Sequence, residues 1–172
     1  CLVGSEMCIR DSMKLSDQWE AINKARRTLP VDVEQLAETL GVKLQKAYLG
    51  PGLSGVLERN GEEFRITINA DDPLTRQRFT LAHELGHYML HRHLIGDGVD
   101  DDRAYRSTVG GKYYNIRIGP EQETEANKFA ATLLMPKPMI EHVRSIGASV
   151  GDMATQFGVS EHAMSIRLGV PY

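Results

Sequence analysis

The pentapeptide His83-Glu84-Leu85-Gly86-His87, an H-E-x-x-H pattern, constrains this chain more than any other feature. In an α-helix, residues four apart lie on nearly the same face, separated by about 6 Å along the axis. The two imidazoles can therefore bind one metal ion. The Glu84 side chain lies off that face, which favours contact with a metal-bound water over contact with the metal itself. The spacing predicts two zinc ligands and a general base on one helix.

The residues around this pattern predict the helix that it requires. Asp72 and Pro73 supply a helix cap and a first-turn proline, and the helix is expected to run to about Arg92. Apolar residues recur at helical spacing along it, namely Leu74, Phe79, Leu81, Ala82, Leu85, Met89 and Leu90. This context favours a metal-binding helix over a surface helix with incidental histidines.

A catalytic zinc site needs a third protein ligand and one open position for water. His91 lies two turns beyond His83, about 12 Å along a straight helix, too far for both to bind one ion. His93 has the spacing of the third histidine in H-E-x-x-H-x-x-G-x-x-H proteases, but Leu90 stands where their glycine bends the chain. We therefore expect the third ligand to come from elsewhere.

The segment Pro120–Pro136 is predicted to form a second helix with a glutamate available as that ligand. Its buried stripe comprises Ala126, Phe129, Ala130, Leu133 and Leu134. Glu121 points away from the stripe, whereas Glu123 and Glu125 border it. Glu125 lies deeper in the helix, where a carboxylate beside Phe129 would need a partner such as a cation. We select Glu125, because the preference of acidic residues for a helix N-terminus explains the other two glutamates.

Two stretches of the chain resemble the ImmA/IrrE family: RQRFTLAHELGH at 76–87 and EANKFAATLLMP at 125–136. The similarity spans roughly residues 15–168. Proteins of that family are zinc metallopeptidases of prokaryotes and phages, often encoded with helix-turn-helix repressors. They are implicated in repressor cleavage, stress response or toxin–antitoxin pairs. The resemblance implies zinc at His83, His87 and Glu125 with Glu84 as base, and it names no substrate, because the family does not share one.

Shorter patterns predict an α+β fold of the zincin-like kind, which this chain resembles. Helices are expected from Ser16 toward Leu29 and from Val33 to Leu40, a strand at 42–49, and a hairpin of 55–59 with 63–69 around Asn60-Gly61. These strands predict a small antiparallel sheet beside the H-E-x-x-H helix. In zincin-like folds the strand before the metal helix pairs with an extended substrate, so Arg65–Asn69 is a candidate edge for peptide binding. An ordinary core strand is the alternative.

The segment Leu94–Gly119, rich in glycine and aspartate, is predicted to be a long loop between the two site helices, with a short strand at Tyr113–Ile118. Tyr113, Tyr114 and His91 are candidates for stabilising the oxyanion of a peptidase reaction. Packing is the commoner role of a tyrosine.

The C-terminal residues 138–172 are predicted to be helical, with a helix, a tight turn and a capped helix at helix-turn-helix spacing between Met153 and Leu168. From Met139 to Tyr172 the arginines are outnumbered by acidic residues: Arg144 and Arg167 against Glu141, Asp152 and Glu161. Such a charge argues against DNA binding. We interpret this part as a packing or partner-binding unit.

The 172 residues, 41% of them apolar, fit one domain, which we place at 13–172. Residues 1–12 resemble translated sequencing-adapter sequence, so we expect a native start at Met13 and exclude both cysteines as ligands. The chain has no apolar run near 18 residues and no secretory leader pattern, which predicts a cytoplasmic location without membrane contact. The net charge of −3 gives no general attraction to nucleic acid.

Two functions fit these observations. The favoured one is a zinc-dependent peptidase that hydrolyses a polypeptide, with a helix-turn-helix repressor encoded nearby as a candidate substrate and Glu84 as the base. The alternative is a non-catalytic regulatory or toxin–antitoxin partner-binding module with a structural or vestigial metal site. A structural metal site needs no general base, so the requirement for Glu84 distinguishes the peptidase from the non-catalytic module.

Overall fold

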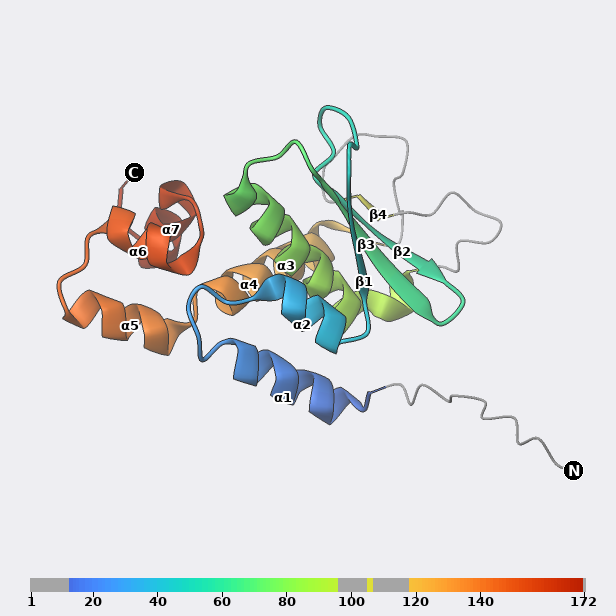
Figure 1. Ribbon diagram of the computed structural model, residues 1–172, viewed down its shortest axis with the longest axis horizontal. Helices are drawn as coiled ribbons and strands as arrows, with labels where there is room; N and C mark the ends of the chain where they lie inside the picture. Colours follow the sequence, from blue (N-terminus) through green and yellow to red (C-terminus); the bar gives the residue numbers. More distant parts are fainter. Residues whose placement is uncertain (1–12, 96–104, 107–117, 172) are drawn as a thin grey trace, which may run out of the picture.

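A computed structural model describes residues 13–95, 105–106 and 118–171 and has the α+β composition expected from the sequence. Its helices are α1 (Leu15–Ala25), α2 (Val33–Thr39), α3 (Leu74–His91), the 3-10 turn η1 (Arg92–Leu94), α4 (Pro120–Leu134), α5 (Lys137–Ser145), α6 (Val150–Phe157) and α7 (Glu161–Leu168). Its strands are β1 (Lys43–Ala47), β2 (Gly55–Asn60), β3 (Glu63–Asn69) and β4 (Tyr105–Arg106). In Figure 1, the sheet lies on one side of α3 and α5–α7 lie on the other.

The sheet has the order β1-β3-β2-β4 and is mixed. The predicted hairpin is confirmed, with β2 antiparallel to β3 and Asn60 opposite Glu63. The expectation of a purely antiparallel sheet is wrong, because β1 runs parallel to β3. Each strand of the hairpin was readable from its own residues, whereas the place where β1 joins it depends on contacts distant in sequence.

Strand β3 lies between β1 and β2, so it is not the free edge that the sequence suggested for peptide binding. Its last four residues, Ile66–Asn69, are all buried. Consecutive burial means that both faces of this part of the strand are covered, as in a central strand. The outer position on that side belongs to β1, all five residues of which are exposed or half-buried. The alternative interpretation of Arg65–Asn69, an ordinary core strand, is the one that the structure supports.

Helix α3 is anchored at its start by side chains that connect it to the sheet. Gln77 donates its Nε2–H groups to the carbonyls of Ala70 and Asp72 at 3.2 and 2.8 Å. Asn69, at the end of β3, donates to the carbonyls of Gly50 and Leu53 and so holds the preceding loop. Pro73 occupies the N-cap without a side-chain cap, so the expected capping role of Asp72 is not found. These bonds fix the direction in which α3 leaves the sheet.

Helices α3 and α4 pack tightly at Gly86, the glycine inside the H-E-x-x-H pattern. A Cβ at this position would lie 3.1 Å from the Cα of Ala126 and 3.2 Å from its carbonyl oxygen. Both are backbone atoms, which can move only with α4 itself. Glycine at 86 and the fully buried alanine at 126 therefore set the spacing between the helices that carry the candidate site.

Replacing Gly86 by Ala is expected to destabilise the protein by about 1–3 kcal/mol, because the added methyl group must displace the α4 backbone. Chemical denaturation measures the loss. Gly151→Ala in α6 is the matched control, because its new methyl group meets the flexible carboxylate of Glu161 at 3.2 Å. That variant should match or slightly exceed the parent in stability. Equal stability of the two variants would contradict the proposed close contact.

The predicted helix, tight turn and capped helix near the C-terminus are present as α6 and α7. Gly158 ends α6 in the left-handed conformation, with φ 64°, and the Ser160 side chain accepts from the Ala163 N–H at the start of α7. Arg78 of α3 donates to the Gly158 carbonyl at 3.0 Å and to the Val31 carbonyl at 2.8 Å. This arginine therefore connects the α6–α7 turn to the helix that carries the metal-binding pattern.

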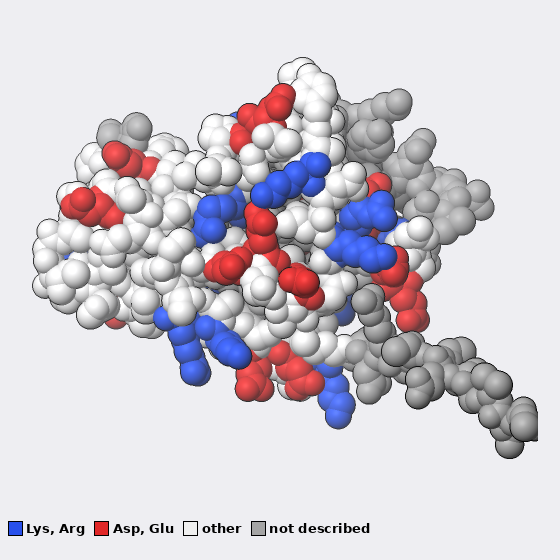
Figure 2. All heavy atoms as spheres, in the orientation of Figure 1, with Lys and Arg blue, Asp and Glu red and all other residues white. Residues whose placement is uncertain are grey.

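Basic and acidic side chains are interspersed over the face drawn in Figure 2, with no continuous basic surface on that face. No helix in the part of the chain that the structure describes is long and apolar enough to cross a membrane. Residues 113–117 of the strand predicted at 113–118, and the adapter-like residues 1–12, lie outside the described residues.

Candidate metal centre

His83 and His87 occupy one face of α3 with their ring nitrogens directed at each other. The two Nε2 atoms are 3.0 Å apart. Both residues are buried, with 3% of His83 and none of His87 exposed. The one-turn spacing predicted from the sequence thus brings the two imidazoles together.

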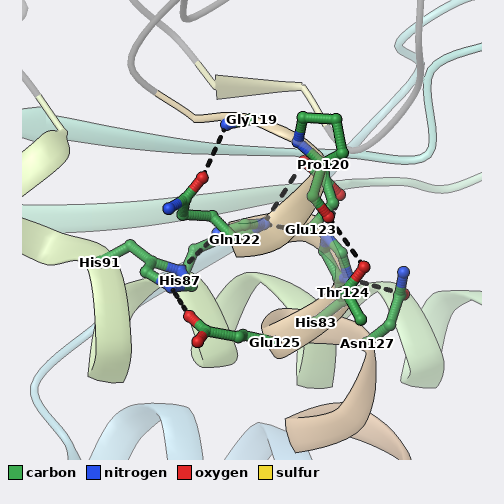
Figure 3. A network of polar contacts seen from close by, with 10 residues as sticks. All are labelled: His83, His87, His91, Gly119, Pro120, Gln122, Glu123, Thr124, Glu125 and Asn127. Atoms are coloured by element: carbon green, nitrogen blue, oxygen red, sulfur yellow. Dashed lines mark hydrogen bonds and ion pairs between the residues drawn. The ribbon is translucent and has the colours of Figure 1, made fainter.

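Helix α4 supplies a carboxylate to the same point through Glu123. Its two oxygens lie 3.3 Å from His83 Nε2 and 3.7 Å from His87 Nε2. The ligand atoms of His83, His87 and Glu123 all lie within 4.8 Å of one another, a group that could hold a metal ion. Figure 3 shows Glu123 over the two histidines, with Asn127 one turn further along α4. Two histidines and a glutamate are a donor set typical of catalytic zinc.

The structure differs here from the sequence-based choice of Glu125. Glu125 instead accepts a hydrogen bond from His91 Nε2 at 2.8 Å, and half of its side chain is exposed. At 100° per residue, Glu123 and Glu125 lie on opposite sides of the Ala126 stripe that packs on α3. The carboxylate of Glu125 does have a polar partner, as expected, but this partner is His91 and not the candidate metal centre. The side of α4 that faces the two ligand histidines is set by packing between helices, which the α4 sequence alone does not reveal.

Hydrogen bonds at the outer nitrogens of the histidines favour one tautomer of each ring. His83 Nδ1 lies 3.0 Å from Asn127 Oδ1, an acceptor, so His83 Nδ1 carries the proton. His91 donates from Nε2 to Glu125, which leaves His91 Nδ1 as an acceptor for the His87 Nδ1–H at 3.1 Å. In neutral rings, both Nε2 atoms then present lone pairs to the same point as the Glu123 carboxylate. Three electron-pair donors so close together are favourable only around positive charge.

The pKa values of the two histidines agree with a site that attracts a cation. Burial alone lowers the pKa of His83, but the hydrogen bond with Glu123 and the charges of Glu84 and Glu123 outweigh it, so the pKa is raised. Burial, with the charges of His83 and His91, lowers the pKa of His87 to about 2. His87 is therefore neutral, as a metal ligand must be.

Glu84 is completely buried between α3 and strand β2. Its neighbour on β2 is Gly55, where a Cβ would lie 3.4 Å from Glu84 Oε1 and 2.3 Å from the Thr80 methyl carbon. The short distance to Thr80 means that only a residue without a side chain allows β2 this close to α3. The structure therefore holds a buried acid next in sequence to the first candidate ligand, where β2 packs tightly on α3.

The other sequence candidates take different positions. His93 is exposed in the turn after α3 and does not join the cluster of His83, His87 and Glu123. His91 is engaged by His87 and Glu125. Tyr113 and Tyr114 lie outside the described residues. Sequence reasoning missed Asn127, although its four-residue spacing from Glu123 repeats that of the two histidines on the facing helix.

Comparisons with known proteins match this chain to two metalloproteases and to the model of one domain family. The chain is 37% identical over 99 residues to the radiation response metalloprotease IrrE of Deinococcus radiodurans, which covers 55% of this chain and 27% of that protein. It is 36% identical over 104 residues to the protein of the same name from Deinococcus deserti, covering 60% and 30%. The chain thus spans less than a third of the length of these curated relatives. Residues 37–169, which include α3 and α4, match the model of the IrrE N-terminal-like peptidase domain, and the chain therefore belongs to the ImmA/IrrE family.

Proposed function

We propose that this chain is a zinc-dependent peptidase that hydrolyses a polypeptide. The observation that carries the proposal is the meeting of His83, His87 and Glu123 beside a buried glutamate, Glu84. In zinc enzymes with two histidines and one glutamate as ligands, a fourth position is open to water. The expectation of a cytoplasmic location stays a prediction.

In this proposal His83 and His87 bind zinc through Nε2, and Glu123 binds through its carboxylate. Asn127 and His91 hold the rings by their Nδ1 atoms, in the way that outer partners orient metal-binding histidines. Bound zinc would lower the pKa of water and polarise the substrate carbonyl. The proposal replaces Glu125 by Glu123 in the set of ligands expected from the sequence.

The role of Glu84 is to move a proton. Its carboxylate accepts a proton from the attacking water as the water oxygen forms a bond to the carbonyl carbon of the peptide. The same carboxyl group then donates that proton to the nitrogen of the leaving amine as the C–N bond breaks. A buried acid suits this role because its few competing contacts with bulk water leave its proton for the reacting atoms.

A helix-turn-helix repressor encoded next to this chain is the first candidate substrate, as the resemblance to the family suggests. Incubation of the two purified proteins with zinc should yield discrete repressor fragments in mass spectrometry, and a zinc chelator should abolish them. A peptide library made from a digested proteome tests for hydrolysis independently of that partner. A chain that binds zinc but cleaves neither substrate would contradict the peptidase and favour the non-catalytic module, whose partner would co-purify uncleaved.

A further inference from the structure

A cavity of about 660 Å³ lies between the start of α3, the second half of α4 and α7. Its walls are mainly apolar and include Phe79, Ala131, Met135, Val159, Ala163 and Ile166. Ile166, one of these lining residues, is 68% exposed, so part of the apolar wall of the cavity is open to solvent. A hollow of this size can hold one large side chain together with part of its neighbours.

The cavity continues the candidate metal centre along the same two helices. Phe79 precedes His83 on α3 by one turn, about 6 Å, and Arg76 precedes it by two turns, about 10 Å. On the facing helix, Asn127 both lines the cavity and contacts His83. An extended peptide advances about 3.3 Å per residue, so the cavity lies within about two or three residues of a bond positioned at the metal centre.

The charged groups around this cavity are of one sign. Arg76 and Arg167 line it, with His162, and none of its lining residues is acidic. Arg167 donates from Nε to the Met135 carbonyl at 3.2 Å, which fixes its guanidinium at the cavity wall. Arg76 is exposed, and its other side borders the turn that holds Asp71 and Asp72. An apolar hollow with arginines at its border is complementary to an apolar side chain followed by a carboxylate.

We propose that this cavity is a substrate-binding subsite that selects a large apolar side chain within about two or three residues of the cleaved bond and an acidic residue about one position further out. The proposal rests on the peptidase function proposed above for the choice of ligand. The occupant is an extended segment of a polypeptide, held by the apolar walls and by the Arg76 and Arg167 guanidinium groups.

Binding of short fluorescein-labelled peptides, followed by fluorescence polarisation with the full chain, tests this subsite without requiring hydrolysis. The probe is a Gly/Ser peptide with one Phe and one Glu at adjacent positions, made in both orders. One order should bind about tenfold more tightly than peptides with Ala for Phe or Lys for Glu. Equal binding of all of these peptides would overturn the inference.

Substitutions at two exposed positions test whether the preference for Phe and Glu arises at this cavity. Ile166→Asp should abolish the advantage of Phe, whereas Ile146→Asp should keep it, because Ile146 is equally exposed at 69% but lies outside the cavity. Arg76→Glu should reverse the preference from Glu to Lys, whereas Arg27→Glu, at an exposed position in the turn after α1 and outside the cavity, should leave it unchanged. A preference that survives Ile166→Asp and Arg76→Glu would place the binding elsewhere and contradict the proposal.

Cleavage of the same peptides, measured in parallel with zinc, separates the two proposals. Selective binding without hydrolysis would contradict the peptidase and retain the subsite. Hydrolysis that is indifferent to Phe and Glu would retain the peptidase and overturn the subsite.

Discussion

Replacing Glu84 by Gln is expected to lower kcat for peptide hydrolysis by about 10²–10⁴-fold, the contribution typical of a general acid–base group. Glutamine has nearly the same shape and can fill the same buried volume against Gly55, but it cannot accept the proton of the attacking water. Zinc content should be unchanged, because the three proposed ligands remain. Elemental analysis and steady-state kinetics on the same preparation measure both quantities.

Glu84 is buried, so a change in fold must be distinguished from a change in chemistry. Thermal unfolding of Glu84→Gln should remain cooperative, and its zinc affinity should match that of the parent. Gln77→Glu is unsuitable as a control, because it alters the hydrogen bonds at the start of α3. Glu121→Gln, at the exposed start of α4, is a better one and should retain full activity. Full hydrolysis by Glu84→Gln would exclude Glu84 as the base.

The parts of the site that were predictable from the sequence lie within single elements. The periodicity of α3 placed His83 and His87 on one face, and the Asn60-Gly61 turn identified the hairpin. Both follow from local rules, the helical repeat and the turn geometry. A local sequence pattern was sufficient to predict the structure wherever the interacting residues were close in the chain.

The features that the sequence did not reveal concern the way in which elements meet. The choice between Glu123 and Glu125 depends on the rotation of α4 against α3, which the contact of Gly86 with Ala126 determines. The parallel position of β1 beside β3 likewise depends on contacts far apart in the sequence. The position of Glu125 beside an apolar stripe indicated that its carboxylate would have a partner, and His91 is that partner. A stripe has two sides, however, and its sequence does not say which side faces the candidate metal centre.

This two-sided arrangement gives α4 two different roles at the centre. On one side of the Ala126 stripe, Glu123 and Asn127 contact His83. On the other side, Glu125 contacts His91, which in turn contacts His87. Each proposed histidine ligand is thus held from its outer nitrogen by a chain of contacts that ends on α4. Substitutions of Glu123 and Glu125 are therefore expected to differ in their effect on zinc affinity.

Replacing Glu123 by Gln is expected to weaken zinc binding by more than about 100-fold, beyond the range typical for loss of an outer-shell partner. The change removes the anionic ligand and the negative charge between the two histidines, while the side chain keeps its size. Competition with a chromophoric chelator measures the affinity. Because the readout is metal binding, it does not depend on identifying a substrate.

Glu125→Gln provides the matched comparison two residues away. Its amide oxygen can still accept from His91 Nε2, so the tautomers remain and only the charge at the end of the chain is lost. Zinc affinity should fall by no more than the 10–100-fold that outer partners contribute. A larger loss from Glu125→Gln than from Glu123→Gln would restore Glu125 as the ligand, in which case α4 would have to turn against α3 on metal binding. That rotation would separate Gly86 from Ala126, so Gly86→Ala would then leave zinc affinity unaffected. With Glu123 as the ligand, by contrast, a methyl group at position 86 would displace α4, and zinc affinity should fall.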